Sequence, residues 1–348
     1  MSWIVSRPFD LTFFIGLPLL AALVALLLPA HAELPVWGYV AFILLIDVAH
    51  VWSSLWRTYL DPIERRQHPL LLTLAPLGSL VGCAAVFSIA PGLFWTAMAY
   101  LAVFHFSRQE LGFAMLYRKR AGLPMGSLDA RVERWLVYAL TLGPILWWHA
   151  HLPRDFAWFM PGDFLTGLPG WALVPAGGIG AILALSHLAL RLRSGLSTPG
   201  RDLRLCTTAC VWFGGIVLTN GDFSFTLSNV VAHGVPYVAL VAFAARRRWA
   251  LRGEGAGRPW IFTLAGAPVF LLPLLALAFT EEGLWDAFVW GEHRQIFGDW
   301  GLEALSTHWL VPLLSVPQVT HYVLDGFIWK LDGSNPGLAE ELLGAPAP

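Results

Sequence analysis

Long apolar stretches recur along the whole chain, and they constrain its fold more than any other feature. A helix needs roughly 20 consecutive apolar residues to cross the hydrocarbon core of a bilayer. About ten stretches are long enough, and they lie at 11–29, 36–56, 70–90, 93–117, 135–152, 169–190, 204–220, 223–245, 259–279 and 307–329. The sequence therefore predicts an all-α fold, a polytopic bundle of about ten transmembrane helices.

Composition supports a membrane location. Hydrophobic residues make up 57% of the 348-residue chain and charged residues only 13%, about half the charged fraction of a soluble domain. The net charge is −1, so no bulk positive field attracts nucleic acid, and no basic domain or nucleic-acid motif is present. We expect the lipid bilayer as a partner and no nucleic acid.

The distribution of Lys and Arg predicts the orientation. With the N-terminus inside, nineteen of the 22 cations fall in inside segments, two fall outside, and Arg108 lies within a span. Such a bias is a strong positive-inside signal. It predicts that both termini are cytoplasmic, and we interpret the chain as an integral protein of a bacterial inner membrane.

A single transmembrane domain is expected over residues 1–330. The stretch 280–306 is rich in aromatic residues, which is typical of a short helix lying on the outer interface. A short cytoplasmic tail follows at 331–348, and its Gly and Pro content predicts a loose segment.

Four expected spans contain a histidine well away from their ends, each with a polar neighbour three or four residues away. These sets are His50 with Asp47, His105 with Gln109, His233 with Asn229, and His321 with Gln318 and Asp325. The spacing places each set on one helix face. Ionisable groups in hydrocarbon are costly, so they normally face the interior of a bundle and find partners there.

The four histidines are expected at similar depth. All four spans run from outside to inside, and each histidine precedes the next inside cation by 7 to 13 residues. At 1.5 Å per residue these counts correspond to depths of roughly 10 to 20 Å. The four imidazoles are therefore expected in one layer of the cytoplasmic half of the membrane, as a shared site requires.

Histidines and carboxylates in this pattern fit a metal or cofactor site, a proton or substrate pathway through the bundle, or hydrogen bonding between helices, and we interpret them as a metal site. Imidazole suits iron, zinc, copper and nickel, and carboxylates add oxygen ligands. We predict His50, His105, His233 and His321 as ligands, with Asp47 and Asp325 in or beside the ligand set. Side chains that orient a ligating histidine are expected nearby, and the candidates are Gln109, Asn229 and Gln318.

Arg108 and Glu110 are the predicted catalytic residues, because Arg108 can offset negative charge or bind an anionic group of a substrate. An arginine this deep in a span is expected to pair with Asp47, Glu110 or Asp325. Two further histidines lie near the ends of their expected spans. His149 is predicted at the outer interface. His187, near the inner end of its span, could join the four-histidine cluster, but we interpret it as interfacial.

Separate histidines on several spans resemble the pattern of histidine-rich integral-membrane non-haem iron enzymes. These include membrane fatty-acid desaturases and hydroxylases and the Brp/Blh carotene-cleaving dioxygenases. The H-x-x-x-H and H-x-x-H-H boxes of desaturases are absent here. The Brp/Blh likeness maps an all-histidine iron site to His50, His105, His233 and His321. It implies iron, dioxygen and a lipid-like substrate.

Our leading hypothesis is a membrane-embedded metalloenzyme that binds non-haem iron and oxidises a lipidic substrate, with an electron-donor protein as a further partner. Another transition metal or haem is an alternative cofactor. Two alternative functions stay open: a haem- or quinone-linked electron carrier, and a transporter with a polar pathway of His, Asp and Arg side chains.

Overall fold

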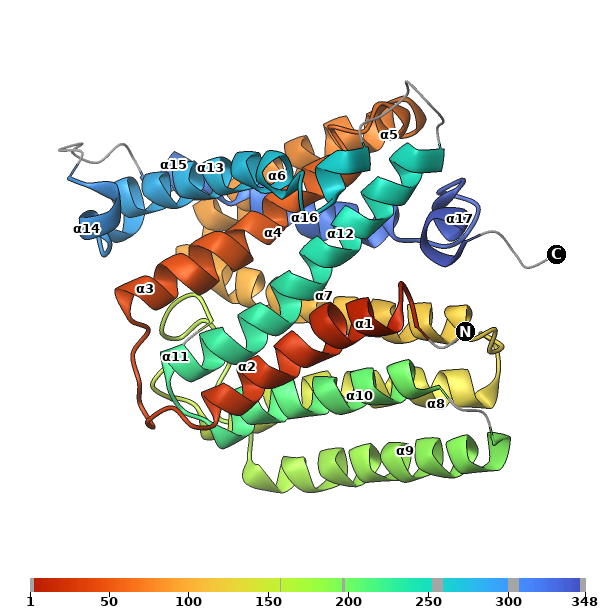
Figure 1. Cartoon of the computed structure of the whole chain (residues 1–348). Coiled ribbons are helices and arrows are strands. Elements are labelled where there is room, and N and C mark those ends of the chain that lie inside the picture. Colours follow the sequence, from red (N-terminus) through yellow and green to blue (C-terminus); the bar gives the residue numbers. More distant parts are fainter. Residues whose placement is uncertain (1–2, 157, 196–197, 252–258, 300–306, 345–348) are drawn as a thin grey trace. The chain divides into compact units, whose positions relative to one another are not determined.

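The computed structural model describes residues 3–156, 158–195, 198–251, 259–299 and 307–344. Within these ranges the chain is all helical and contains no strand (Figure 1). Six helical segments are long and apolar enough to cross a membrane, and they are Arg7–Ala25, Val36–Arg57, Pro69–Ile89, Gly170–Ser194, Asp222–Leu251 and Ala267–Trp290. The all-α membrane fold is thereby supported, while the count of ten spans and the orientation remain predictions.

Helices also occupy the other expected spans. The stretch at 93–117 lies in α7 (Pro91–Arg120), and its low hydropathy reflects His105, Arg108, Gln109 and Glu110. The remaining stretches lie in α8 (Leu128–His151), in α10 (Pro199–Trp212) with the π-helical η5 (Phe213–Leu218), and in α15 (Thr307–Leu314) with α16 (Val316–Ile328). Polar and charged side chains therefore distinguish α7, α8 and α10 with η5 from the six apolar segments, whereas α15 and α16 are apolar but are each too short to cross a membrane alone.

The chain forms two compact units. The first contains residues 1–35 and 98–236. Besides most of α7 it comprises α1 (Arg7–Phe9), η1 (Asp10–Gly16), α2 (Leu17–Ala25), α8, η4 (Gly170–Ala172), α9 (Leu173–Ser194), α10, η5, α11 (Asp222–Phe225), η6 (Thr226–Val230) and the start of α12 (Val231–Leu251). Its aromatic core surrounds Trp148, which is fully buried. Helix α9 runs alongside α8 (Figure 1).

The second unit contains residues 36–97 and 237–348. It comprises α3 (Val36–Gly38), η2 (Tyr39–Val48), α4 (Ala49–Ser53), η3 (Ser54–Arg57), α5 (Pro62–Gln67), α6 (Pro69–Ile89), the rest of α12, η7 (Pro259–Phe262), α13 (Ala267–Trp285), η8 (Asp286–Trp290), α14 (Arg294–Phe297), α15, α16 and α17 (Leu338–Leu343). Leu72 and Ala75 of α6 pack against Leu324 and Ile328 of α16.

Two predicted segments differ in detail from the structure. The expected outer segment at 280–306 begins within α13, which continues to Trp285 and through η8 to Trp290, and then contains the short helix α14. Its residues 300–306 lie outside the described residues. The tail is not loose over its described part: α17 is a helix in which Leu338 and Leu342 are buried. The prediction of a loose tail overlooked these two leucines, which share a helix face at i,i+4.

Candidate metal centre

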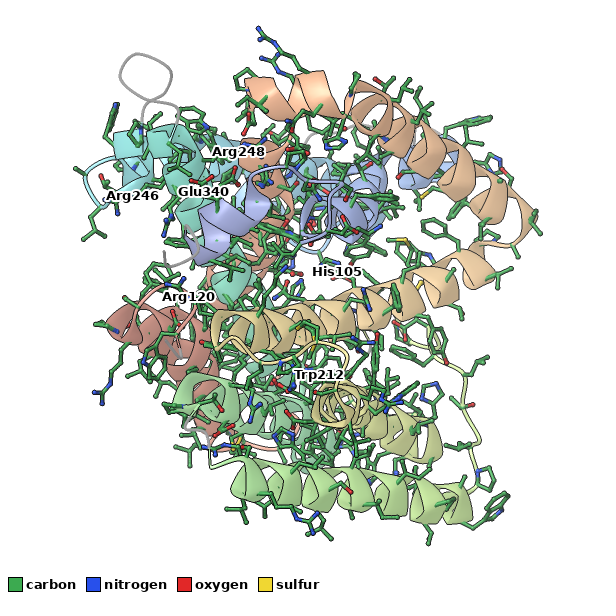
Figure 2. The ribbon with its side chains drawn as sticks, turned by 90° about the vertical axis from the view of Figure 1, so that its right-hand side faces the viewer. His105, Arg120, Trp212, Arg246, Arg248 and Glu340 are labelled. Carbon is green, nitrogen blue, oxygen red and sulfur yellow. The ribbon has the colours of Figure 1, made fainter. Side chains whose placement is uncertain are left out.

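The first unit holds His105 and His233 side by side. His105 lies in the middle of α7, far along the helix from Arg120 at its end (Figure 2). Both histidines are buried, and their ring centroids are 4.9 Å apart with the planes at 78°. Phe106 stacks on the His233 ring at 3.6 Å. This packing limits rotation of the His233 imidazole and keeps the pair in an apolar, water-poor environment.

The second unit holds the other two histidines in a similar arrangement. His50 and His321 are buried, and their ring centroids are 5.0 Å apart with the planes at 80°. The buried Tyr237 presents its ring to both, with centroids 5.7 Å from His50 and 5.0 Å from His321. The second unit thus holds two buried imidazoles at close range, as the first unit does.

The four imidazoles form one buried group of potential ligands. Each ring offers one nitrogen, and these nitrogens all lie within 4.8 Å of one another. Two nitrogens bound to one ion at about 2.0–2.1 Å can be at most about 4.2 Å apart, so small side-chain adjustments would bring the set into coordination range. The group formed by His50, His105, His233 and His321 could therefore bind a metal ion.

Backbone geometry near two of these histidines is unusual. His50 lies two residues after the π-helical η2, and His233 lies three residues after the π-helical η6. Single π-helical turns are frequent at functional sites, but η2 is ten residues long and π-helical segments also occur at η1, η5 and η8, so the π-helical backbone does not by itself mark the site. Hydrophobicity and residue spacing do not reveal such turns, so the sequence did not predict them.

Both predicted carboxylates lie beside a histidine of the second unit. Asp47 Oδ1 is 3.5 Å from His50 Nδ1, and Asp325 Oδ2 is 3.8 Å from His321 Nε2. Asp325 Oδ1 accepts hydrogen bonds from Tyr237 Oη at 2.6 Å and Trp329 Nε1 at 3.2 Å. These separations are longer than hydrogen bonds, and a closer approach would let each carboxylate orient a ligating imidazole through its second nitrogen. Tyr237 and Trp329 were not predicted to take part in the site, although Trp329 follows Asp325 by one helical turn.

The three predicted amide side chains have other contacts. Gln109 Nε2 donates to the backbone carbonyl of His233 at 2.8 Å. Asn229 Nδ2 donates to Ser228 Oγ at 2.9 Å, and Gln318 Nε2 donates to Tyr322 Oη at 2.7 Å. Gln109 is thus adjacent to the centre through the backbone of a predicted ligand. Roles for these amides in holding a cofactor remain predictions.

The pairing predicted for Arg108 is wrong. Arg108 is exposed, and its guanidinium donates to Tyr138 Oη at 3.0 Å. Glu110 is buried and pairs instead with Arg204, while its other oxygen accepts from Thr208 Oγ1 at 2.6 Å. Residues three apart are neighbours on a helix surface, so Arg108 marks the edge of the buried face of α7 that carries His105, and Tyr138 supplies a polar contact there. Catalytic roles for Arg108 and Glu110 stay predictions.

Comparison of the chain with known protein families, curated proteins and solved structures finds no match in any of the three. The resemblance to membrane non-haem iron enzymes therefore rests on the histidine pattern alone, and the geometry of the histidines carries the functional argument.

Proposed function

We propose that the protein is a membrane-embedded metalloenzyme in which His50, His105, His233 and His321 bind one non-haem iron ion. The observation that carries this proposal is the convergence of four buried imidazoles, with nitrogens within 4.8 Å of one another. Ionisable side chains inside a membrane are costly and by default mark functional sites, and one metal ion would use all four imidazoles at once.

The number of imidazoles favours a bare metal ion over haem. A porphyrin occupies four positions around its iron and leaves two axial positions, so it has no use for four histidines at one point. Imidazole nitrogen suits iron, zinc, copper and nickel. We favour iron because a site in hydrocarbon has direct access to lipidic substrates, and iron supplies oxidation with dioxygen.

The substrate in this proposal is a lipidic molecule that enters from the bilayer, such as an acyl chain, an isoprenoid or a carotenoid. Dioxygen is the oxidant. If one oxygen atom of dioxygen is inserted into the substrate, two electrons from an external donor protein are also required. If the substrate is cleaved and both oxygen atoms are inserted, no external electrons are required. Asp47 and Asp325 orient His50 and His321, and Tyr237 holds Asp325 in place.

Metal analysis of the detergent-purified chain, with absorption spectra alongside, tests the proposal. We expect one iron per chain and no Soret band. His105→Ala and His321→Ala, one from each pair, should each remove most of the bound metal, because one ion uses both pairs. His149→Ala is the matched control, since His149 is bonded to Tyr100 and to the Ile145 carbonyl and lies outside the group.

Three outcomes would contradict the shared site. Retention of wild-type metal content by both variants would show that the histidines do not bind it. Loss of only half of the metal in each variant would show that the two pairs bind separate ions. A Soret band would support the haem-linked alternative. Folding of each variant is checked by size-exclusion chromatography and thermal melting.

A further inference from the structure

A second cluster of potential ligands lies within the first unit, on α8 and α9. Asp129 and Glu133 are four residues apart on α8, and His187 lies on the neighbouring α9. One ligand atom from each of these three residues lies within 4.8 Å of the others. Glu133 and His187 are buried at 0% and 8% exposure, while the Asp129 side chain is 26% exposed.

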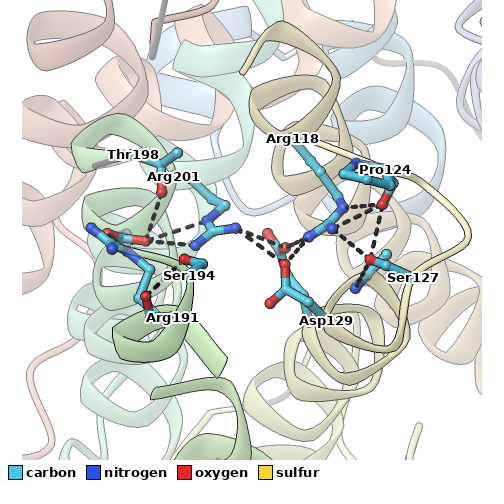
Figure 3. Close-up of polar contacts among 11 residues, drawn as sticks. Arg118, Pro124, Ser127, Asp129, Arg191, Ser194, Thr198 and Arg201 are labelled. Atoms are coloured by element: carbon cyan, nitrogen blue, oxygen red, sulfur yellow. Dashed lines mark hydrogen bonds and ion pairs between the residues drawn. The ribbon is translucent and has the colours of Figure 1, made fainter. Parts of the chain in front are cut away.

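Two arginines bind only one side of each carboxylate. Arg118 contacts Asp129 Oδ2 at 2.6 Å (Figure 3). It also contacts Glu133 Oε2 at 2.8 Å. Arg201 lies farther away, at 3.7 Å and 3.6 Å from the same two oxygens. The remaining oxygens, Asp129 Oδ1 and Glu133 Oε1, are buried and accept no hydrogen bond from any described residue. His187 Nδ1 is likewise buried without a hydrogen-bond partner among the described residues.

Three buried polar atoms without partners are costly, because each loses its hydration and gains no bond in return. They come from two acidic side chains and one imidazole, which is a donor set that suits Mn²⁺, Fe²⁺ or Zn²⁺. The partial exposure of Asp129 leaves an approach for an ion from the aqueous side. These features distinguish the cluster from an ordinary ion-pair network, in which the arginines would take every carboxylate oxygen.

We propose that Asp129, Glu133 and His187 form a second, exchangeable binding site for a divalent transition-metal ion, which ties α8 to α9. Two guanidiniums nearby already balance the two carboxylates, so a dication adds charge to a neutral cluster and binds more weakly than it would without them. The site therefore exchanges its ion with solution. It is separate from the four-histidine group, shares no residue with it and does not depend on the proposed enzymatic function.

Mn²⁺ titration of the metal-stripped full chain in detergent tests this site, with free Mn²⁺ measured by electron paramagnetic resonance. The titration uses the His105→Ala/His321→Ala variant, in which the four-histidine group is disabled. We expect one saturable Mn²⁺ per chain. Adding His187→Gln should weaken its binding roughly ten-fold or more. His187 makes no contact with the arginines that would endanger folding, whereas Glu133→Gln disturbs the buried Arg118 pair.

Asp202→Asn is the matched control. Asp202 belongs to the same charged neighbourhood, since it pairs with Arg191 at 2.8 Å and with Arg201 at 3.3 Å, but it supplies no proposed ligand. It should therefore retain Mn²⁺. Equal weakening by Asp202→Asn and His187→Gln would overturn the site in favour of diffuse attraction. Absence of saturable binding would also overturn it and leave water as the occupant. If the double variant does not fold, His187→Gln is introduced into the wild-type chain instead. Loss of the proposed site is then measured as one fewer bound ion per chain.

Discussion

Buried arginines show at the residue scale how this chain keeps charge away from lipid. Arg204 is almost fully buried, pairs with Glu110, donates to the Phe14 carbonyl at 2.5 Å and lies over the Phe113 ring. Arg108, near the middle of α7, is exposed and lies beside Tyr138. Burial and pairing, and not position along a span, therefore separate the structural arginine from the peripheral one.

Substitution by leucine should distinguish these two arginines. We expect Arg204→Leu to destabilise the protein by about 3–5 kcal/mol, because it leaves the buried Glu110 carboxylate without its partner. Arg108→Leu should change stability by no more than about 0.5 kcal/mol, as for other surface positions. Thermal melting in detergent compares the two variants. Equal melting temperatures for both would show that the Arg204–Glu110 pair does not hold the unit together.

At the scale of single elements, the short helix α17 docks through both charge and apolar contact. Glu341 lies 3.4 Å from Arg248 and 3.8 Å from Arg57. Both arginines also pair with Glu64, each at 3.0 Å, and burial raises the pKa of the Glu64 carboxyl. Arg57 in turn lies over the ring of Trp329, which donates to Asp325 beside His321. Contacts thus run from α17 to the metal centre within the second unit.

Leu342→Ala should weaken the packing of α17 against the rest of the second unit. Leu342 is 1% exposed, and truncation of a buried leucine costs about 2 kcal/mol or more. The undocked fraction should rise about 30-fold, and limited proteolysis should cleave the tail correspondingly faster. Glu340→Ala is the control, because Glu340 is exposed on the same helix (Figure 2). Equal cleavage rates in the two variants would mean that the leucine does not hold the tail.

At the scale of the whole molecule, topology remains a prediction from charge. The bias of nineteen inside cations to two outside predicts that reporters fused after residues 62, 125 and 340 lie in the cytoplasm. Reporters near 92, 160 and 290 should lie outside. Alkaline phosphatase and green fluorescent protein fusions measure the two compartments. Two or more reversed sites would invalidate the ten-span arrangement and the common depth inferred for the histidines.

The sequence alone determined the membrane character and the choice of the four histidines. A helix in hydrocarbon must be apolar over its whole length, so spans appear in the composition. A histidine there is conspicuous because burying it is costly. The prediction that His50, His105, His233 and His321 belong together therefore needed only spacing and depth, and their close approach agrees with it.

Only the tertiary structure decided which partners the polar side chains choose. Pairing of Glu110 with Arg204 joins residues 94 positions apart, and the cluster of Asp129 and Glu133 with His187 depends on how α8 and α9 pack. Helical spacing predicts neighbours within one helix and is silent on contacts between helices. Interhelical packing therefore decided the role of Arg204, the docking of α17 and the second ligand cluster, which the sequence could not predict.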